Sequence, residues 1–322
     1  MKNGSDTLRR CLSSLMNSNT TLKEIIVVDD ASHDATADIT RQFDVRLISL
    51  DHSVGAATAR NIGAKHATGN CLFFTDCDIE IPPGGIDAMV EFMKKKKSLA
   101  AIGILRKDTE ITTPASRYEN YYMHRHYAVH DDEIEILYTS AACISRELFM
   151  SLGGFDEAYK GATIEDMEFG QRLVRSGYRI SINKSLLVHH LKRFTLCSLL
   201  RANFHKAQGT LKIRLRNAES GTVTSKLVAP PLSFIAGIPI TVLLWMLTGA
   251  GLVLMFPPAF FAASLLLIII CLLNMSWLTF LMKSAGLGFM LAGIGIMLLN
   301  YSAYAAGITW GFLSFASGRR YA

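Results

Sequence analysis

Charged residues are almost absent from the last third of this 322-residue chain. Between Ala229 and Arg319 the sequence contains one charged side chain, Lys283, whereas the residues before Ala229 have the charge content of an ordinary globular domain. Long uncharged, apolar segments are typical of helices that lie in a lipid bilayer. The distribution disfavours a chain that is soluble throughout and predicts a globular part followed by a membrane part.

The uncharged region contains three apolar stretches, each about 20 residues or longer, which suffices to cross a hydrocarbon core of ~30 Å. They are separated by Pro257-Pro258 and by the break from Lys283 to Gly286 and cover residues 232–256, 259–277 and 287–312. We therefore expect about three transmembrane helices in residues 229–322. After three crossings Arg319-Arg320 would lie outside, against the positive-inside trend, so either the trend is overridden or one stretch does not span.

Paired cysteines are also missing. The six cysteines show no Cys-x-x-Cys spacing, so we expect reduced thiols in a cytosol-facing domain. Zinc-finger and RNA-binding patterns are absent, so the net charge of +6 does not indicate a nucleic-acid partner. Basic residues gather instead just before the apolar tail, as expected beside an anionic cytoplasmic leaflet. The pattern predicts a basic amphipathic juxtamembrane segment over residues 196–228, contact with membrane lipids, and a multi-pass cell-membrane protein whose globular domain is cytoplasmic.

The glycine pattern of dinucleotide-binding folds, Gly-x-Gly-x-x-Gly, is absent from the Gly55 region, which disfavours a Rossmann dehydrogenase. Strand and helix patterns nevertheless alternate through the first third of the chain, which predicts right-handed βαβ units, an α/β class and a mostly parallel sheet. The expected strands cover residues 24–29, 45–50, 71–75 and 99–105, and the expected helices residues 5–18, 34–43, 56–67 and 85–96.

Carboxylates follow two of these strands. Asp76 and Asp78 come directly after the strand at residues 71–75, and residues i and i+2 of extended chain point to the same side. Ligands of open α/β sheets collect at this carboxyl edge. Two facing carboxylates repel each other unless a cation lies between them, and Mg²⁺ is held by one or two carboxylates together with substrate phosphates. The alternative is a polar turn after a strand.

Five motifs occur in a fixed order along the chain. They are Val28-Asp29-Asp30-Ala31-Ser32-His33-Asp34-Ala35-Thr36, Ala59-Arg60-Asn61-Ile62-Gly63, Asp76-Cys77-Asp78, Gly153-Gly154-Phe155-Asp156 and Glu165-Asp166. This ordered set resembles the family 2 glycosyltransferases, which have the GT-A fold. The resemblance covers roughly residues 3–195 and implies a nucleotide-sugar-binding domain over residues 1–195. The chain starts at the first helix of the family pattern, so we expect the first β-strand of the family to be absent and the domain to be N-terminally truncated.

The resemblance assigns roles to the acidic and basic residues of these motifs. Asp76 and Asp78 would hold a divalent metal, Mg or Mn, with Asp78 as the more direct ligand and His190 as a further one. Asp29, Asp30, Arg60 and Asp76 would contact the nucleotide. For Arg60 the alternative is a surface helix residue, and for His190 it is a structural or membrane-facing histidine. Cys77 is expected to be a small filler, since no base is evident beside it.

Asp166 matches the family position for the general base, which takes the proton of an acceptor hydroxyl. Glu165 would orient the acceptor or the base. Because both lie at a helix start, we expect the helix dipole to lower the pKa of Asp166. The alternative is an acidic pair that only stabilises the helix. One face of attack and one base imply inversion at the anomeric carbon.

The sequence thus predicts a metal-dependent, inverting transfer from a UDP- or GDP-linked sugar to a lipid-linked or glycan acceptor at the cytoplasmic membrane face, in glycolipid or surface polysaccharide synthesis. A processive synthase is disfavoured, because no Gln-x-x-Arg-Trp follows the Glu-Asp pair. The alternatives are a polyprenyl-phosphate glycosyltransferase and a non-catalytic nucleotide-sugar-binding membrane subunit. The spacing of His124, His126 and His130 resembles a metal site, but one helix cannot direct all three to one point, so a structural role is preferred.

Overall fold

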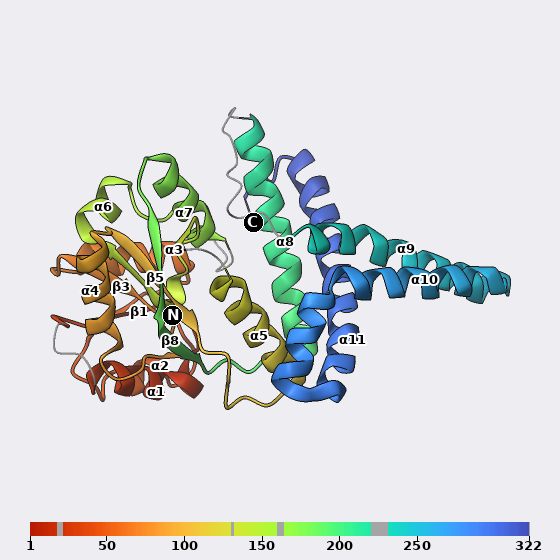
Figure 1. The fold of residues 1–322 in the computed structure, drawn as a ribbon. Coiled ribbons are helices and arrows are strands. Elements are labelled where there is room, and N and C mark those ends of the chain that lie inside the picture. The colour runs from red at the N-terminus through yellow and green to blue at the C-terminus, as the bar shows by residue number, and fades with distance from the viewer. Residues whose placement is uncertain (18–21, 130–131, 160–163, 220–230, 322) are drawn as a thin grey trace. The chain divides into compact units, whose positions relative to one another are not determined.

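The computed structural model describes residues 1–17, 22–129, 132–159, 164–219 and 231–321. The chain divides into two compact units (Figure 1). Unit 1 contains residues 1–112 and 119–193, and unit 2 contains residues 113–118 and 194–322. The short piece 113–118 is the start of helix α5 (Pro114–Ala128), so this one helix contributes to both units.

The first part of unit 1 is a two-stranded parallel sheet with three helices. Strand β1 (Ile26–Asp29) pairs with β2 (Arg46–Ser49), and the helices are α1 (Ser5–Met16), α2 (Thr36–Thr40) and α3 (Ala56–His66). Leu8 and Leu12 of α1 are buried in one core with Val27 of β1. These elements lie within two residues of the expected ranges, except that α2 ends earlier, so the periodicity locates them well.

A six-stranded sheet forms the centre of unit 1. Strands β3 (Cys71–Phe74), β7 (Ala142–Ser145), β5 (Ala100–Leu105), β8 (Ile180–His190) and β4 (Ile79–Glu80) are hydrogen-bonded in that order, and β6 (Glu133–Ile134) pairs with β8. Among its described pairings β5–β8 is parallel and the others are antiparallel. The expectation of a mostly parallel sheet is therefore wrong, although the α/β class is right. Strands β3 and β5 do run in the same direction, but β7 lies between them in the sheet and runs against both.

Helices α4 (Gly85–Lys96), α6 (Arg146–Ser151) and α7 (Glu165–Arg175) complete unit 1. Four phenylalanines pack around the carboxyl end of β3. The ring of Phe74 lies 5.2 Å from that of Phe149 and 5.4 Å from that of Phe155, and the Phe155 and Phe169 rings are 5.2 Å apart. This aromatic cluster fixes the start of α7 beside the loop that follows β3.

Unit 2 is helical. Its helices are α8 (Leu196–Glu219), α9 (Leu232–Leu254), α10 (Pro257–Leu273) and α11 (Met275–Ala316), and Gly286 interrupts α11 with a φ of 85°. Within the described part of the chain, α9 and α11 are long and apolar enough to cross a membrane by length and composition, while α10 has 17 residues. The interruption at Gly286 lies in the break expected between residues 283 and 286.

Candidate active site

Arg60 joins two of the predicted motifs. Its Nη2 lies 2.8 Å from Oδ1 of Asp76, and its Nη1 lies 2.5 Å from Oε1 of Glu165. Burial alone would lower the pKa of Arg60, but the two carboxylates outweigh it and raise that pKa above its ordinary value. The guanidinium is thus a fixed cation between the loop after β3 and the start of α7. The surface-residue alternative for Arg60 does not fit these contacts.

Asp76 receives a hydrogen bond on each carboxylate oxygen. Oδ1 accepts from Arg60, and Oδ2 accepts from the Ser140 hydroxyl at 2.8 Å. Burial would raise the pKa of Asp76, but Arg60 and Ser140 hold it below its ordinary value. Since both oxygens are oriented by protein donors, Asp76 is better placed to position Arg60 than to serve as an open metal ligand.

Asp78 lies closer to a second candidate ligand. Its Oδ2 is 3.7 Å from Nε2 of His190, and the backbone N–H of Leu191 donates to the Asp78 carbonyl at 2.7 Å. Antiparallel pairing of β4 with β8 places Ile79 opposite His190, which fixes this approach. The residues that the structure describes contain no group of three His, Cys, Asp or Glu side chains able to hold a metal ion. Asp78 and His190 are the pair that could hold a divalent cation together with substrate oxygens, and their roles as metal ligands stay predictions.

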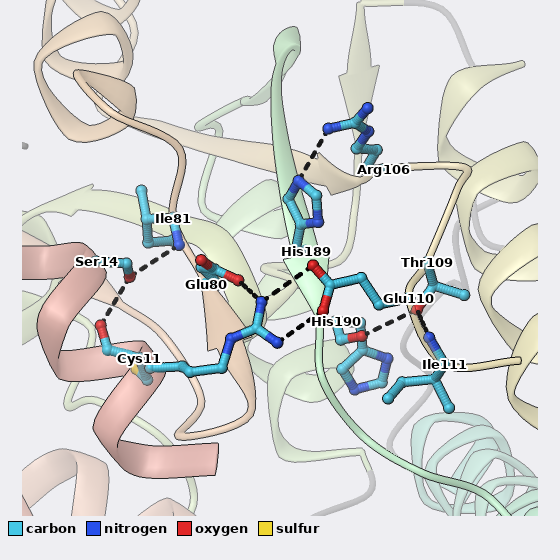
Figure 2. A network of polar contacts seen from close by, with 11 residues as sticks. Cys11, Ser14, Glu80, Ile81, Arg106, Thr109, Glu110, Ile111, His189 and His190 are labelled. Atoms are coloured by element: carbon cyan, nitrogen blue, oxygen red, sulfur yellow. Dashed lines mark hydrogen bonds and ion pairs between the residues drawn. The ribbon is translucent and has the colours of Figure 1, made fainter.

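Polar contacts brace the strands that carry this pair (Figure 2). Arg10 of α1 forms ion pairs with Glu80 of β4 and with Glu110, and the Arg10–Glu110 distance is 2.8 Å. Arg106 Nη1 lies 3.1 Å from His189 Nε2 on β8. The network ties α1, β4, β8 and the segment after β5 together next to Asp78 and His190.

Asp166 lies half-buried in the first turn of α7, where its Oδ1 accepts from the backbone N–H of Met167 at 2.8 Å. Burial and the neighbouring Glu165 carboxylate raise the pKa of Asp166 to about 7, although Arg60 opposes this. The expectation that the helix dipole lowers this pKa is wrong, because desolvation and like charge outweigh the helix terminus here. A carboxylate with a pKa near 7 suits general-base chemistry.

Glu165 faces into the protein. Its side chain is 3% exposed, Oε1 pairs with Arg60, and Oε2 accepts from the backbone N–H of Ile164 at 3.0 Å. These contacts make Glu165 a positioning residue for Arg60. The sequence predicted that Glu165 orients the acceptor or the base. These contacts test neither role, so both stay predictions.

Asp29 and Asp30 are buried and bind their own chain. The Asp30 carboxylate accepts from the backbone N–H of Val54 at 2.6 Å, from Gly55 N–H at 3.1 Å and from the Ser53 hydroxyl at 2.8 Å. Burial would raise the pKa of Asp30, but these donors lower it below its ordinary value. Oδ1 of Asp29 accepts from Ser32 N–H at 3.1 Å. Both residues therefore shape the loops at the end of β1, and their nucleotide contacts stay predictions.

Two residues that the sequence reasoning missed complete the site. Ser140, in a short 3₁₀ turn at Thr139–Ala141, orients Asp76, and no motif marked it. Asn61 follows Arg60; its Nδ2 donates to the Phe155 carbonyl at 2.8 Å, and its Oδ1 accepts from Phe155 N–H at 2.9 Å. Asn61 thereby ties two motifs together, and its place beside Arg60 in the Ala59–Gly63 motif was the signal that could have found it.

Other candidates fall outside the site. His124 Nδ1 lies 2.7 Å from the Leu105 carbonyl, and the His126 ring stacks on Tyr122, so the two contacts support a structural role. His130 lies outside the described residues. Burial raises the pKa of the Cys77 thiol to about 11, which supports its interpretation as a filler.

The sequence model described as glycosyl transferase family 2 matches residues 1–153. Residues 1–153 belong to this family. A glycosyltransferase named GlyA from Streptococcus pneumoniae is 24% identical over 59% of this chain and 29% of its own length. A pre-mycofactocin glycosyltransferase from Mycobacterium tuberculosis is 28% identical over 61% of this chain and 42% of its own. The chain thus spans less than half the length of these two relatives.

The fold agrees with the family. The solved structure of a mannosyltransferase from Pyrobaculum calidifontis in complex with GDP-Man and Mn²⁺ matches 96% of this chain and 85% of its own with a TM-score of 0.58, at 19% sequence identity. The family 2 domain therefore has a GT-A-like α/β fold, as the sequence predicted.

Proposed function

We propose that this family 2 domain transfers a sugar from a nucleotide-sugar donor to an acceptor, with inversion and with a divalent metal. The observation that carries the proposal is the continuous set of contacts from Asp76 through Arg60 to Glu165, the residue before Asp166. It connects Asp76, after β3, with the first turn of α7, where Asp166 directly follows Glu165. Sugar transfer requires a positioned positive charge for the leaving diphosphate and a positioned base for the acceptor, and Arg60 and Asp166 are candidates for these two roles.

Asp78 and His190 are the residues that would hold the metal, Mg or Mn. When bound there, the metal would stabilise the negative charge that develops on the leaving diphosphate. Arg60 adds a fixed positive charge close by, held by Asp76 and Glu165. Asp29 and Asp30 support the loops on the donor side. The relative from Pyrobaculum was solved with GDP-Man and Mn²⁺, which supports this assignment.

Asp166 would accept the proton of an acceptor hydroxyl as that hydroxyl attacks the anomeric carbon. Its raised pKa makes it a stronger base than an ordinary carboxylate while leaving it largely ionised above pH 7. Attack from the side opposite the diphosphate inverts the anomeric centre. A polyprenyl-phosphate acceptor arrives already ionised and would need Asp166 less.

The donor nucleotide is UDP or GDP in this proposal, and the acceptor is lipid-linked or a glycan. Membrane attachment through the apolar helices of unit 2 would bring the domain to a lipid-linked acceptor at the cytoplasmic face, with bilayer lipids as partners. A non-catalytic nucleotide-sugar-binding subunit is the second candidate. The raised pKa and the placement of Asp166 favour the enzyme, because binding alone has no use for a base.

The proposal is tested with the full chain in lipid vesicles. Radiolabelled UDP- and GDP-sugars are offered with Mn²⁺ to lipid-linked and glycan acceptors, and transfer and donor hydrolysis are both followed. We expect transfer that stops on chelation and returns with Mn²⁺. Donor binding without transfer or hydrolysis across the panel would favour the binding subunit.

A further inference from the structure

Helices α8 and α11 of unit 2 lie side by side and run in the same direction (Figure 1). Asn203 Nδ2 donates to Asn300 Oδ1 at 3.0 Å near one end, and Glu219 pairs with Arg320 at 2.6 Å near the other. Between them, a Cβ on Gly307 would lie 2.3 Å from the Phe204 carbonyl oxygen. The residue numbers rise together along both helices, so the second half of α11 follows α8 over its length.

The composition of α8 prevents both helices from crossing a bilayer. It carries basic side chains through its whole length, and charged groups cost about 2.5–3.5 kcal/mol each at the centre of a spanning helix. These residues are Arg201, Lys206, Lys212, Arg214 and Arg216. Helix α11 as a whole is long and apolar enough for a span. Its second half cannot cross, however, while α8 beside it stays at the surface.

The α9–α10 hairpin runs across this helix pair in Figure 1. Its base packs on α11, where a Cβ on Gly237 would meet the Tyr301 ring at 2.5 Å and Trp245 Nε1 donates to Ser302 Oγ at 2.9 Å. Beyond Trp245, α9 continues to Leu254, about 13 Å at 1.5 Å per residue. That is about half of a hydrocarbon core of ~30 Å, and no more than one leaflet deep.

The tip of the hairpin is apolar throughout. Residues 249–263 contain no charged, amide or hydroxyl side chain, and Val253 and Met255 are 82% and 86% exposed. A turn that emerged on the far side would meet headgroups and water there. An exposed apolar turn is instead suited to ending among acyl chains.

The backbone N–H groups of the turn have partners within the turn or are absent. Phe256 N–H donates to the Gly251 carbonyl at 3.1 Å, and Ala259 N–H donates to the Phe256 carbonyl at 3.1 Å. The two residues between them, Pro257 and Pro258, have no N–H group. The start of a helix normally leaves four unpaired donors, and the prolines remove two of them where no water would be present.

We propose that α9 and α10 form a re-entrant hairpin that enters one leaflet and returns, with its tip at residues 252–261 in the hydrocarbon, and that the second half of α11 lies beside α8 at the surface it entered from. The proposal rests on the membrane association stated under Proposed function. Arg319-Arg320 then stays on the same side as α8, so the expected conflict with the positive-inside trend disappears. It replaces the prediction of about three crossings in residues 229–322.

Cysteine accessibility tests this topology in the full chain, in sealed vesicles of a zwitterionic and anionic lipid mixture. The variants are Val253→Cys at the tip, Leu232→Cys at the 80%-exposed base of α9, and Arg319→Cys after α11. A membrane-impermeant maleimide is added to one side at a time, and peptide mass spectrometry reads each site separately. Native Cys197, exposed in the first turn of α8, marks the near side.

We expect Leu232→Cys and Arg319→Cys to react only from the side of Cys197, and Val253→Cys to react from neither side until detergent is added. Reaction of Val253→Cys or Arg319→Cys from the opposite side would overturn the re-entrant topology. A chain that does not bind vesicles at all would instead refute membrane association. As a second measurement, Val253→Arg should reduce carbonate-resistant binding about tenfold or more relative to Val253→Leu; equal binding of the two would also overturn the hydrocarbon location.

Discussion

Glu165 and Arg60 form a partly buried ion pair, 2.5 Å between Oε1 and Nη1, across 105 residues of sequence. The pair places the charge of α3 beside the first turn of α7. Because the same guanidinium holds Asp76, a change at Glu165 reaches both sides of the proposed reaction centre. The Arg60 guanidinium is thus a positive charge whose position in the site is fixed by two carboxylates.

Glu165→Gln should disturb transfer through this pair. The substitution keeps the shape of the side chain and removes its charge, so Arg60 loses one of two partners. We expect kcat to fall about tenfold, since mispositioning costs rate more than binding. The Glu165 charge also raises the pKa of Asp166, so its removal should move the acidic limb of the pH–rate profile to lower pH.

The control for this prediction is Glu133→Gln, which breaks the exposed pair with Arg179. Exposed ion pairs contribute little, so neither the rate nor the profile should change. A Glu165→Gln profile that keeps its parental limb would show that Glu165 does not act on Asp166.

The pH dependence of transfer follows from Asp166. Below a pKa of about 7 the carboxyl is protonated and cannot accept a proton, so we expect kcat/KM to fall about tenfold per pH unit there. Asp166→Asn should lower transfer by about 10²-fold or more, leave donor binding nearly intact and abolish the limb. A rate to a hydroxyl acceptor that is unchanged in Asp166→Asn would leave only the helix-stabilising role.

Protonation of Asp166 also bears on folding. Its pKa in the folded chain lies above the ordinary value of 3.8, so the folded state binds more protons than the unfolded state between about pH 4 and 7. This group alone therefore makes the fold less stable as pH rises through that window. Replacement by Asn should flatten the dependence, as measured by urea unfolding at a series of pH values.

Motif order and periodicity predicted helices α1 to α4 and strands β1, β2, β3 and β5 of unit 1, together with the residues that meet around Arg60. They did not predict strand order, because the position of β7 between β3 and β5 depends on long-range pairing that a local pattern does not record. Strand β8 starts at Ile180, although an uninterrupted apolar pattern begins only at Leu186, because Lys184 and Ser185 interrupt it. Ser140 was missed for the same reason: its role comes from a contact 64 residues away.

Electrostatic details were the least predictable from the sequence. The position of Asp166 at a helix start suggested a lowered pKa, and only burial beside Glu165 reverses the sign. The apolar stretches were located well, but hydropathy does not report that α11 lies along the charged helix α8. Length and composition describe one segment by itself, whereas its ability to span the membrane also depends on the helix that packs against it.

Gly170→Ala tests how closely α7 is packed. A Cβ at this position would lie 2.4 Å from the Glu135 carbonyl oxygen and 2.8 Å from the Leu137 nitrogen, which are backbone atoms that cannot rotate away. Alanine normally favours a helix over glycine by about 1 kcal/mol, so a loss would reflect the clash. We expect destabilisation of about 1–3 kcal/mol, the usual range for overpacking, in thermal or denaturant unfolding.

The same chemical change at Gly288 of α11 serves as the control, because nothing lies within 4 Å of a Cβ there. Gly288→Ala should leave unfolding unchanged or raise the midpoint slightly. Equal behaviour of the two variants would show that α7 is not held against residues 135–137 as described.

The last prediction separates the two aspartates of the Asp76-Cys77-Asp78 motif. Because Asp78 lies near His190 while both oxygens of Asp76 are bound by Arg60 and Ser140, the metal should depend on Asp78. Calorimetric titration of UDP or GDP with and without Mn²⁺ measures this dependence. We expect Asp78→Asn and His190→Gln to weaken Mn²⁺-dependent nucleotide binding about 10- to 100-fold.

Two further variants serve as comparisons for Asp78→Asn and His190→Gln. Glu80 lies two residues after Asp78 and pairs with Arg10. Glu80→Gln should therefore leave the Mn²⁺ dependence of nucleotide binding unchanged, because this side chain belongs to the Arg10 network rather than to the Asp78–His190 pair. Asp76→Asn should weaken nucleotide binding with and without Mn²⁺ by a similar factor, because it loosens Arg60. If Asp76→Asn instead removed the Mn²⁺ dependence as fully as Asp78→Asn, both aspartates would be ligands, and Asp76 would have to exchange Arg60 for the cation when substrate binds.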